Sequence, residues 1–95
     1  MPVELECVVR DSRGEPVEGL PVYLSSEDFA FAGITHVDGS VRFVAPVGYS
    51  LYLYFYNPIR QRYVGKEFKF ESHGRVRVDL EFELTMGGCG VQHVL

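Results

Sequence analysis

Residues 46–57 constrain the fold of this chain more than any other stretch. A β-strand points successive side chains to opposite faces of its sheet, so a repeat of two residues separates an inner face from an outer one. The inner set is largely apolar and consists of Tyr49, Leu51, Leu53 and Phe55. The outer set is polar or amphipathic and consists of Ser50, Tyr52, Tyr54 and Tyr56. The pattern predicts a long central strand of an all-β domain.

Six further segments with apolar alternation, bounded by turn residues, each predict a strand. They cover residues 3–10, 20–25, 29–35, 41–45, 64–71 and 76–84. No long segment repeats with the helical period, so we expect little or no helix. Seven short strands separated by turns predict a seven-stranded Greek-key β-sandwich over residues 1–86. A glycine-hinged C-terminal tail over residues 87–95 is expected to follow it.

Local signals refine three of these strands. Pro21 suggests that residues 20–25 form an edge strand, because proline lacks the N–H that a second neighbouring strand would need. Asp38-Gly39 is a strong hairpin signal between two alternating segments. Gly33 is consistent with a bulge in the third strand. Residues 26–28 fit either the approach to that strand or one short helical turn, and the sequence leaves both interpretations open.

The first half of the chain resembles the carboxypeptidase regulatory-like domains. The resemblance rests on the Gly14-Glu15-Pro16 turn within residues 9–24 and on the Asp38-Gly39 turn, followed by Gly48-Tyr49. It implies a transthyretin-like, seven-stranded sandwich in which these are scaffold residues. Members of that family are structural and binding accessories found beside many activities, so the resemblance implies no reaction. The transthyretin relatives that hydrolyse 5-hydroxyisourate end in Tyr-Arg-Gly-Ser, which is absent here.

Composition excludes several classes of function. A hydrophobic content of 46% and a charged content of 23% are ordinary for a globular domain. The net charge of −4 argues against a nucleic-acid partner, which favours a basic face. No apolar run approaches the roughly 20 residues of a membrane helix. The first residues lack the features of a secretory signal, so we expect a cytoplasmic protein, or an extracellular one if the chain has been processed.

The cysteines and histidines raise the question of a metal. Two cysteines are too few for a disulfide framework, and Cys7 is predicted to be a small buried apolar residue. Cys89 and His93 are spaced so that both could reach one ion, with His36 as a further candidate. Structural zinc takes four ligands, and no second closely spaced pair is present. We therefore expect no metal and no cofactor, and we expect turn histidines and a free tail thiol.

The sequence predicts two contact surfaces and no catalytic residues. No nucleophile elbow, phosphate-binding loop or metalloprotease motif is present. One surface is the row formed by Tyr52, Tyr54 and Tyr56, with Tyr23 and Tyr63 as further candidates, although tyrosine also simply favours strands. The second surface is the apolar end of the tail, whose contact residues are Val91, Val94 and Leu95.

These surfaces lead to one functional hypothesis and two alternatives. The hypothesis is a non-enzymatic interaction module that forms a homo-oligomer or filament, or that accompanies a larger protein partner. The first alternative is a carbohydrate-binding or small-ligand-binding module that uses the same tyrosines. The second is a small metal-binding protein built on Cys89, His93 and one further histidine.

Overall fold

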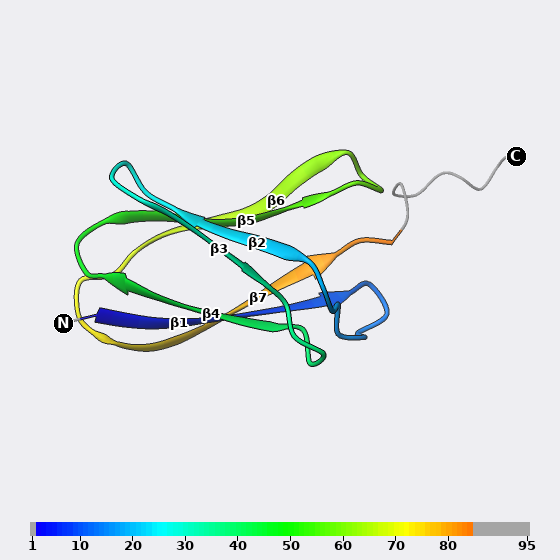
Figure 1. Ribbon diagram of the computed structural model, residues 1–95, viewed down its shortest axis with the longest axis horizontal. Helices are drawn as coiled ribbons and strands as arrows, with labels where there is room; N and C mark the ends of the chain where they lie inside the picture. Colours follow the sequence, from blue (N-terminus) through cyan, green and yellow to red (C-terminus); the bar gives the residue numbers. More distant parts are fainter. Residues whose placement is uncertain (1, 85–95) are drawn as a thin grey trace, which may run out of the picture.

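The computed structural model describes residues 2–84, which form seven strands in two facing sheets (Figure 1). The strands are β1 (Pro2–Asp11), β2 (Pro21–Ser25), β3 (Ala30–Ile34), β4 (Ser40–Pro46), β5 (Ser50–Asn57), β6 (Arg62–Lys69) and β7 (Gly74–Phe82). No helix occurs within this part of the chain, and therefore none that could span a membrane. The prediction of an all-β sandwich is confirmed. The predicted tail lies outside the described residues.

The order of the strands is β4-β1-β7 in one sheet and β3-β2-β5-β6 in the other. Figure 1 shows these sheets as the lower and upper layers of the molecule. All neighbours are antiparallel except β1 and β7, which run parallel. Strand β5 lies between β2 and β6, so its predicted central position is confirmed.

The prediction that Pro21 marks an edge strand is wrong, because β2 lies between β3 and β5. The Thr35 N–H donates to the Leu20 carbonyl at 2.9 Å, so the backbone N–H and C=O groups of Leu20 point toward β3. Backbone groups of successive strand residues point to alternate sides, which turns the nitrogen of Pro21 toward β5. The ladder between β2 and β5 begins only at Tyr23, opposite Tyr54. Proline is tolerated here because the neighbouring strand has already diverged.

The Asp38-Gly39 signal is correct as a turn and wrong as a hairpin. The turn joins β3 to β4, which belong to opposite sheets. The His36 N–H donates to the Ser40 carbonyl at 2.9 Å, and Gly39 has a φ of 81°. A Cβ at Gly39 would lie 2.5 Å from the carbonyl oxygen of Val9. Glycine is therefore required both by the backbone conformation and by the close approach of β1.

Two further local expectations are resolved by the backbone. Gly33 makes no bulge: it pairs in regular register with Val22. Its Cβ would lie 2.5 Å from Cγ2 of Val41, so the missing side chain lets β3 pack closely on β4. Residues 26–28 form a bend, closed by the Ser26 N–H donating to the Phe29 carbonyl at 2.8 Å, and they form no helical turn.

The core is a single apolar layer between the sheets. Its fully buried members include Leu51, Leu53 and Phe55 of β5, as the alternation predicted. The same layer contains Leu5, Cys7, Val9, Val22, Leu24, Val41, Phe43, Ala45, Val78 and Leu80. Tyr49 was predicted to point inward, but it precedes β5, is 38% exposed and packs edge-on against Phe29 at 5.6 Å. The chain bends at Gly48, where φ is 86°, and the alternation of β5 begins only at Ser50, so Tyr49 is not part of it.

Asn57 connects the end of β5 to the chain beyond β7. Its side chain is fully buried, and its amide donates to the Glu83 carbonyl at 3.1 Å. Its Oδ1 accepts from the N–H groups of Ile59 and Arg60 at 2.9 and 3.2 Å. Every polar atom of this side chain therefore has a partner, which buried polar groups require.

Burial of the Cys7 thiol makes the free energy of unfolding depend on pH in the alkaline range. Desolvation, with a smaller effect of the Asp79 charge, raises the pKa of Cys7 from 9.0 to about 12. An unfolded thiol ionises near pH 9 while the folded one keeps its proton. Its contribution to stability is therefore fully present below about pH 9 and is lost as the pH rises toward about 12.

We expect the difference in free energy of unfolding between the protein and Cys7→Ala to shrink by about 2 kcal/mol from about pH 8 to about pH 10.5. Urea denaturation at each pH measures this difference. Cys89, the tyrosines and the lysines are common to both chains, so their titration largely cancels. A difference that stays constant across this range would contradict the assignment.

Candidate binding surface

The outer face of the β3-β2-β5-β6 sheet gathers five tyrosines from three adjacent strands. We call Tyr23, Tyr52, Tyr54, Tyr56 and Tyr63 the tyrosine face. The register places Tyr23 opposite Tyr54 and Tyr56 opposite Tyr63. Because the inner residues of β5 are locked in the core, the intervening residues must face outward. The predicted row on β5 is thus brought together with tyrosines of β2 and β6.

The rings of the tyrosine face pack on one another around Tyr54. Its ring stacks against Tyr23 at 5.4 Å and Tyr52 at 5.1 Å, and Tyr63 meets it edge-on at 5.6 Å. Tyr63 also meets Tyr56 edge-on at 5.1 Å. Tyr54 is consequently half-buried, whereas Tyr52, Tyr56 and Tyr63 are 43%, 42% and 61% exposed. The surface therefore has an ordered aromatic centre and accessible rings around it.

Gly65 of β6 lies directly opposite Tyr54. A Cβ at this position would lie 2.3 Å from the Leu53 carbonyl oxygen and 2.7 Å from Cβ of Tyr54. The glycine permits a close approach of β6 to β5, and it leaves no side chain beside the Tyr54 ring on that strand. The sequence signal was an isolated glycine within an alternating segment, which often marks such an approach.

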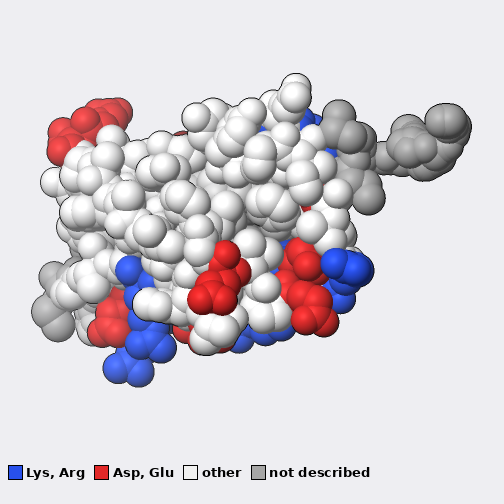
Figure 2. Space-filling view, turned by 45° about the vertical axis from the view of Figure 1, so that its right-hand side comes forward, with Lys and Arg blue, Asp and Glu red and all other residues white. Residues whose placement is uncertain are grey.

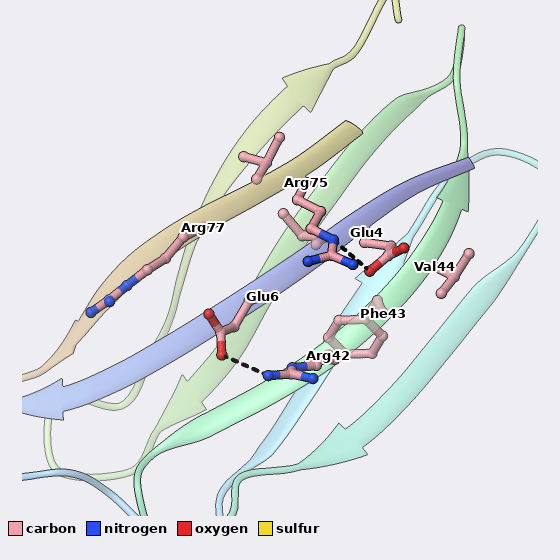
Figure 3. Close-up of a pocket in the computed structure, with 9 residues that line it drawn as sticks. Glu4, Glu6, Arg42, Phe43, Val44, Arg75 and Arg77 are labelled. Carbon is pink, nitrogen blue, oxygen red and sulfur yellow. Dashed lines mark ion pairs between the residues drawn. The ribbon is translucent and has the colours of Figure 1, made fainter. Parts of the chain in front are cut away.

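The other sheet presents a different outer face, on which charged side chains pair with each other. Glu4 and Arg75 are 3.3 Å apart, and Glu6 and Arg42 are 3.6 Å apart. Figure 3 shows both pairs around a shallow pocket on β4, β1 and β7. Figure 2 shows charged side chains along this lower layer and a largely uncharged layer above it. Exposed pairs of this kind stabilise a fold by about 0–1 kcal/mol each, so this face is mainly a solvated one.

The remaining predicted site residues do not converge on a metal centre in the described chain. His36 is exposed at the β3–β4 turn. Nearby, the Ser40 hydroxyl and N–H donate to Asp38 at 2.7 and 3.0 Å, and these bonds lower the pKa of the Asp38 carboxyl. Within residues 2–84 no three histidine, cysteine or acidic residues are grouped to hold an ion. Five predicted residues lie outside the described part: Cys89, Val91, His93, Val94 and Leu95.

Comparison with known proteins identifies the fold. The chain is similar to a DUF3823 family protein from Parabacteroides merdae ATCC 43184, with a TM-score of 0.61 and 12% identity over 83% of this chain and 45% of that one. It is also similar to the Bacillus anthracis TIE protein, with a TM-score of 0.55 and 18% identity over 85% of this chain and 16% of that one. The chain therefore spans less than half the length of each of these proteins.

These structures share the β-sandwich, and at such identities the likeness is one of fold alone. No protein-family model matches the sequence, and no curated protein matches it either. The resemblance to carboxypeptidase regulatory-like domains therefore stays a prediction.

The packing around Tyr54 predicts which tyrosines support the fold. Each aromatic pair contributes about 0.5–1.5 kcal/mol, and Tyr54 makes three pairs while Tyr52 makes one. We expect Tyr54→Ala to lower the free energy of unfolding by about 3 kcal/mol and Tyr52→Ala by about 1 kcal/mol. Urea denaturation of both variants measures the two losses. Equal losses would mean that the rings do not pack around Tyr54.

Proposed function

We propose that this protein is a non-enzymatic interaction module that assembles through the tyrosine face. The observation that carries the proposal is the contrast between the two outer faces. One sheet presents five tyrosines, and the other presents carboxylates and guanidinium groups that already pair with each other. Protein interfaces are enriched in tyrosine and depleted in charge at their centre, which is the composition of the first face.

The arrangement of the rings favours a protein contact over a sugar platform. A sugar stacks on the open face of a ring, whereas Tyr54 has other tyrosines within 5.1–5.6 Å on three sides. Strand side chains stand roughly perpendicular to the sheet, so rings that pack together offer mainly their edges and hydroxyl groups. An apolar body with a polar tip suits a protein surface, in which a hydroxyl finds a hydrogen-bonding partner.

A second copy of the chain is the first partner to test. The five tyrosines carry no charge, and the charged residues beside them, Glu67 opposite Tyr52 and Lys69 opposite Ser50, have opposite signs. Two copies can therefore oppose this face without a surplus of like charge, and two such sheets pack about 10 Å apart. A larger protein would use the same face. The similar folds occur inside longer chains, of which this chain covers 45% and 16%, which supports such an accessory role. The tail residues Val91, Val94 and Leu95 belong to the proposal as a second contact.

We expect the double variant Tyr52→Ser/Tyr56→Ser to weaken association of the full chain by about tenfold or more, because tyrosines central to an interface typically contribute 1–2 kcal/mol each. Sedimentation equilibrium over a concentration series measures the change. Tyr49→Ser is the matched control: Tyr49 is 38% exposed, close to the 43% and 42% of the two tested residues, and lies outside the face. Association that is equally strong in the double variant would refute a contact through the tyrosine face.

The tail is tested separately in the full-length chain. We expect Val91→Asp/Val94→Asp to reduce the mass of the assemblies if the apolar tail residues dock, because each carboxylate would have to be desolvated. Light scattering under reducing conditions measures the mass and removes any contribution of a Cys89 disulfide. An unchanged mass would exclude the tail from assembly and leave the tyrosine face as the contact.

A further inference from the structure

Among the described residues, strand β3 pairs with β2 on one side and has a free edge on the other. The Ser26 N–H donates to the Phe29 carbonyl, and the Thr35 N–H donates to the Leu20 carbonyl. The backbone groups of Phe29 and Thr35 therefore point toward β2. Because backbone direction alternates along a strand, the N–H and C=O groups of Phe31 and Gly33 also point toward β2. The backbone groups of the three residues between them point the other way, to the free edge. These are Ala30, Ala32 and Ile34. Within residues 2–84 no hydrogen bond engages their N–H or C=O groups.

The other three edge strands carry devices that discourage strand addition. On β6, Lys66 lies opposite the buried Leu53 and its ammonium donates to the Asp79 carbonyl at 3.4 Å, so a charge points inward at that edge. Strand β7 alternates charged residues, among them Arg75 and Arg77. Strand β4 carries Arg42 and ends in proline. Inward charges, outward charges and proline all oppose pairing at an edge.

Strand β3 has none of these devices. Its sequence is Ala-Phe-Ala-Gly-Ile, without charge or proline, and no residue of it is fully buried. Phe31 is 42% exposed and Ile34 is 62% exposed. An uncharged apolar edge with unpaired backbone groups is the kind of surface that takes an additional strand.

The side chains of β3 complement a second copy of the same strand. In an antiparallel pair centred on Ala32, this residue faces Ala32 of the second copy and Ala30 faces Ile34. These are the positions whose backbone groups are free, so every free N–H meets a free C=O. Phe31 then faces Gly33 of the second copy in the closer, non-hydrogen-bonded type of pair, where the Cα atoms are only about 4.5 Å apart. A large ring opposite a residue without a side chain fits this spacing.

A hollow borders Gly33, the residue that this ring would face. Gly33, Ile34 and Val41 line it, together with residues of the β3–β4 turn. Gly33 packs directly on Val41 and adds no side chain on the inner side of the sheet, toward which Phe31 of the second copy points. The same register therefore satisfies the backbone, avoids a clash and covers exposed apolar surface.

We propose that β3 pairs antiparallel with β3 of a second copy about a two-fold axis at Ala32. The two four-stranded sheets become one eight-stranded sheet, and the two tyrosine faces become parts of one surface. Tyr23 of one copy lies three strand spacings from Tyr23 of the other, about 14 Å away. This inference deepens the proposed self-assembly and rests on it, but it uses a different part of the molecule.

Two substitutions at one residue test the edge. Ala32→Pro removes a donor that faces away from β2 and so breaks no bond within the chain. Ala32→Lys places two like charges across the axis. We expect each to raise the dissociation constant of the edge-paired dimer by about tenfold or more, measured by sedimentation equilibrium of the full chain. Val44→Lys is the matched control, since Val44 is 59% exposed on another edge strand.

Hydrogen exchange of individual β3 amides tests the proposed register of the β3–β3 pair. In the dimer we expect the amides of Ala30, Ala32 and Ile34 to exchange more slowly than in Ala32→Lys. The amides of Phe31 and Gly33 are bonded to β2 in both proteins and should not change. Urea denaturation of the Ala32 variants shows whether each remains folded.

Several outcomes would overturn the inference. A chain that stays monomeric at all concentrations has no such dimer. If dimers form but the three edge amides exchange as fast as in Ala32→Lys, the dimer uses another surface. If these amides exchange slowly in a monomer, the chain's own tail fills the edge. Protection that appears only on addition of another protein means a different occupant. If Tyr52→Ser/Tyr56→Ser abolishes association while Ala32→Lys does not, the edge inference fails and the proposed function stands.

Discussion

Burial of one face of β5 is the constraint on which the rest of the molecule depends. Leu51, Leu53 and Phe55 are completely removed from solvent between the two sheets. A shift of the strand by one residue would place tyrosines in the core and leucines in water, so the register is fixed by the hydrophobic effect. The outward orientation of Tyr52 and Tyr54 is therefore a consequence of core packing.

Local periodicity accounts for what could be predicted from the sequence. It identified the strands and their inner faces, because both depend on the alternation of neighbouring residues. It could not supply the partners of each strand, since these depend on contacts between distant segments. Three features depended on such distant contacts. They are the parallel pairing of β1 and β7, the place of Pro21 on a strand inside the sheet, and the passage of the Asp38-Gly39 turn from one sheet to the other.

The candidate site divides in the same way. The row on β5 was predictable, but the addition of Tyr23 and Tyr63 required the order β2-β5-β6. The importance of Gly65 required knowing that it lies opposite Tyr54. The free edge of β3 was also beyond the sequence, because an uncharged strand is exposed or covered according to its place in the sheet. Two symmetric contacts with different two-fold axes, one through a face and one through an edge, would close into a tetramer if the axes intersect at right angles and would otherwise build an open assembly.

The parallel pairing of β1 and β7 has a mechanical consequence. Pro2 and Phe82 lie at opposite ends of this pair, because both strands run in the same direction from one end of the sandwich to the other (Figure 1). A pulling force between these two points would act along the strands and load all their hydrogen bonds together in shear. An antiparallel pair pulled from one end opens bond by bond. The sandwich is thus arranged to resist tension along its long axis.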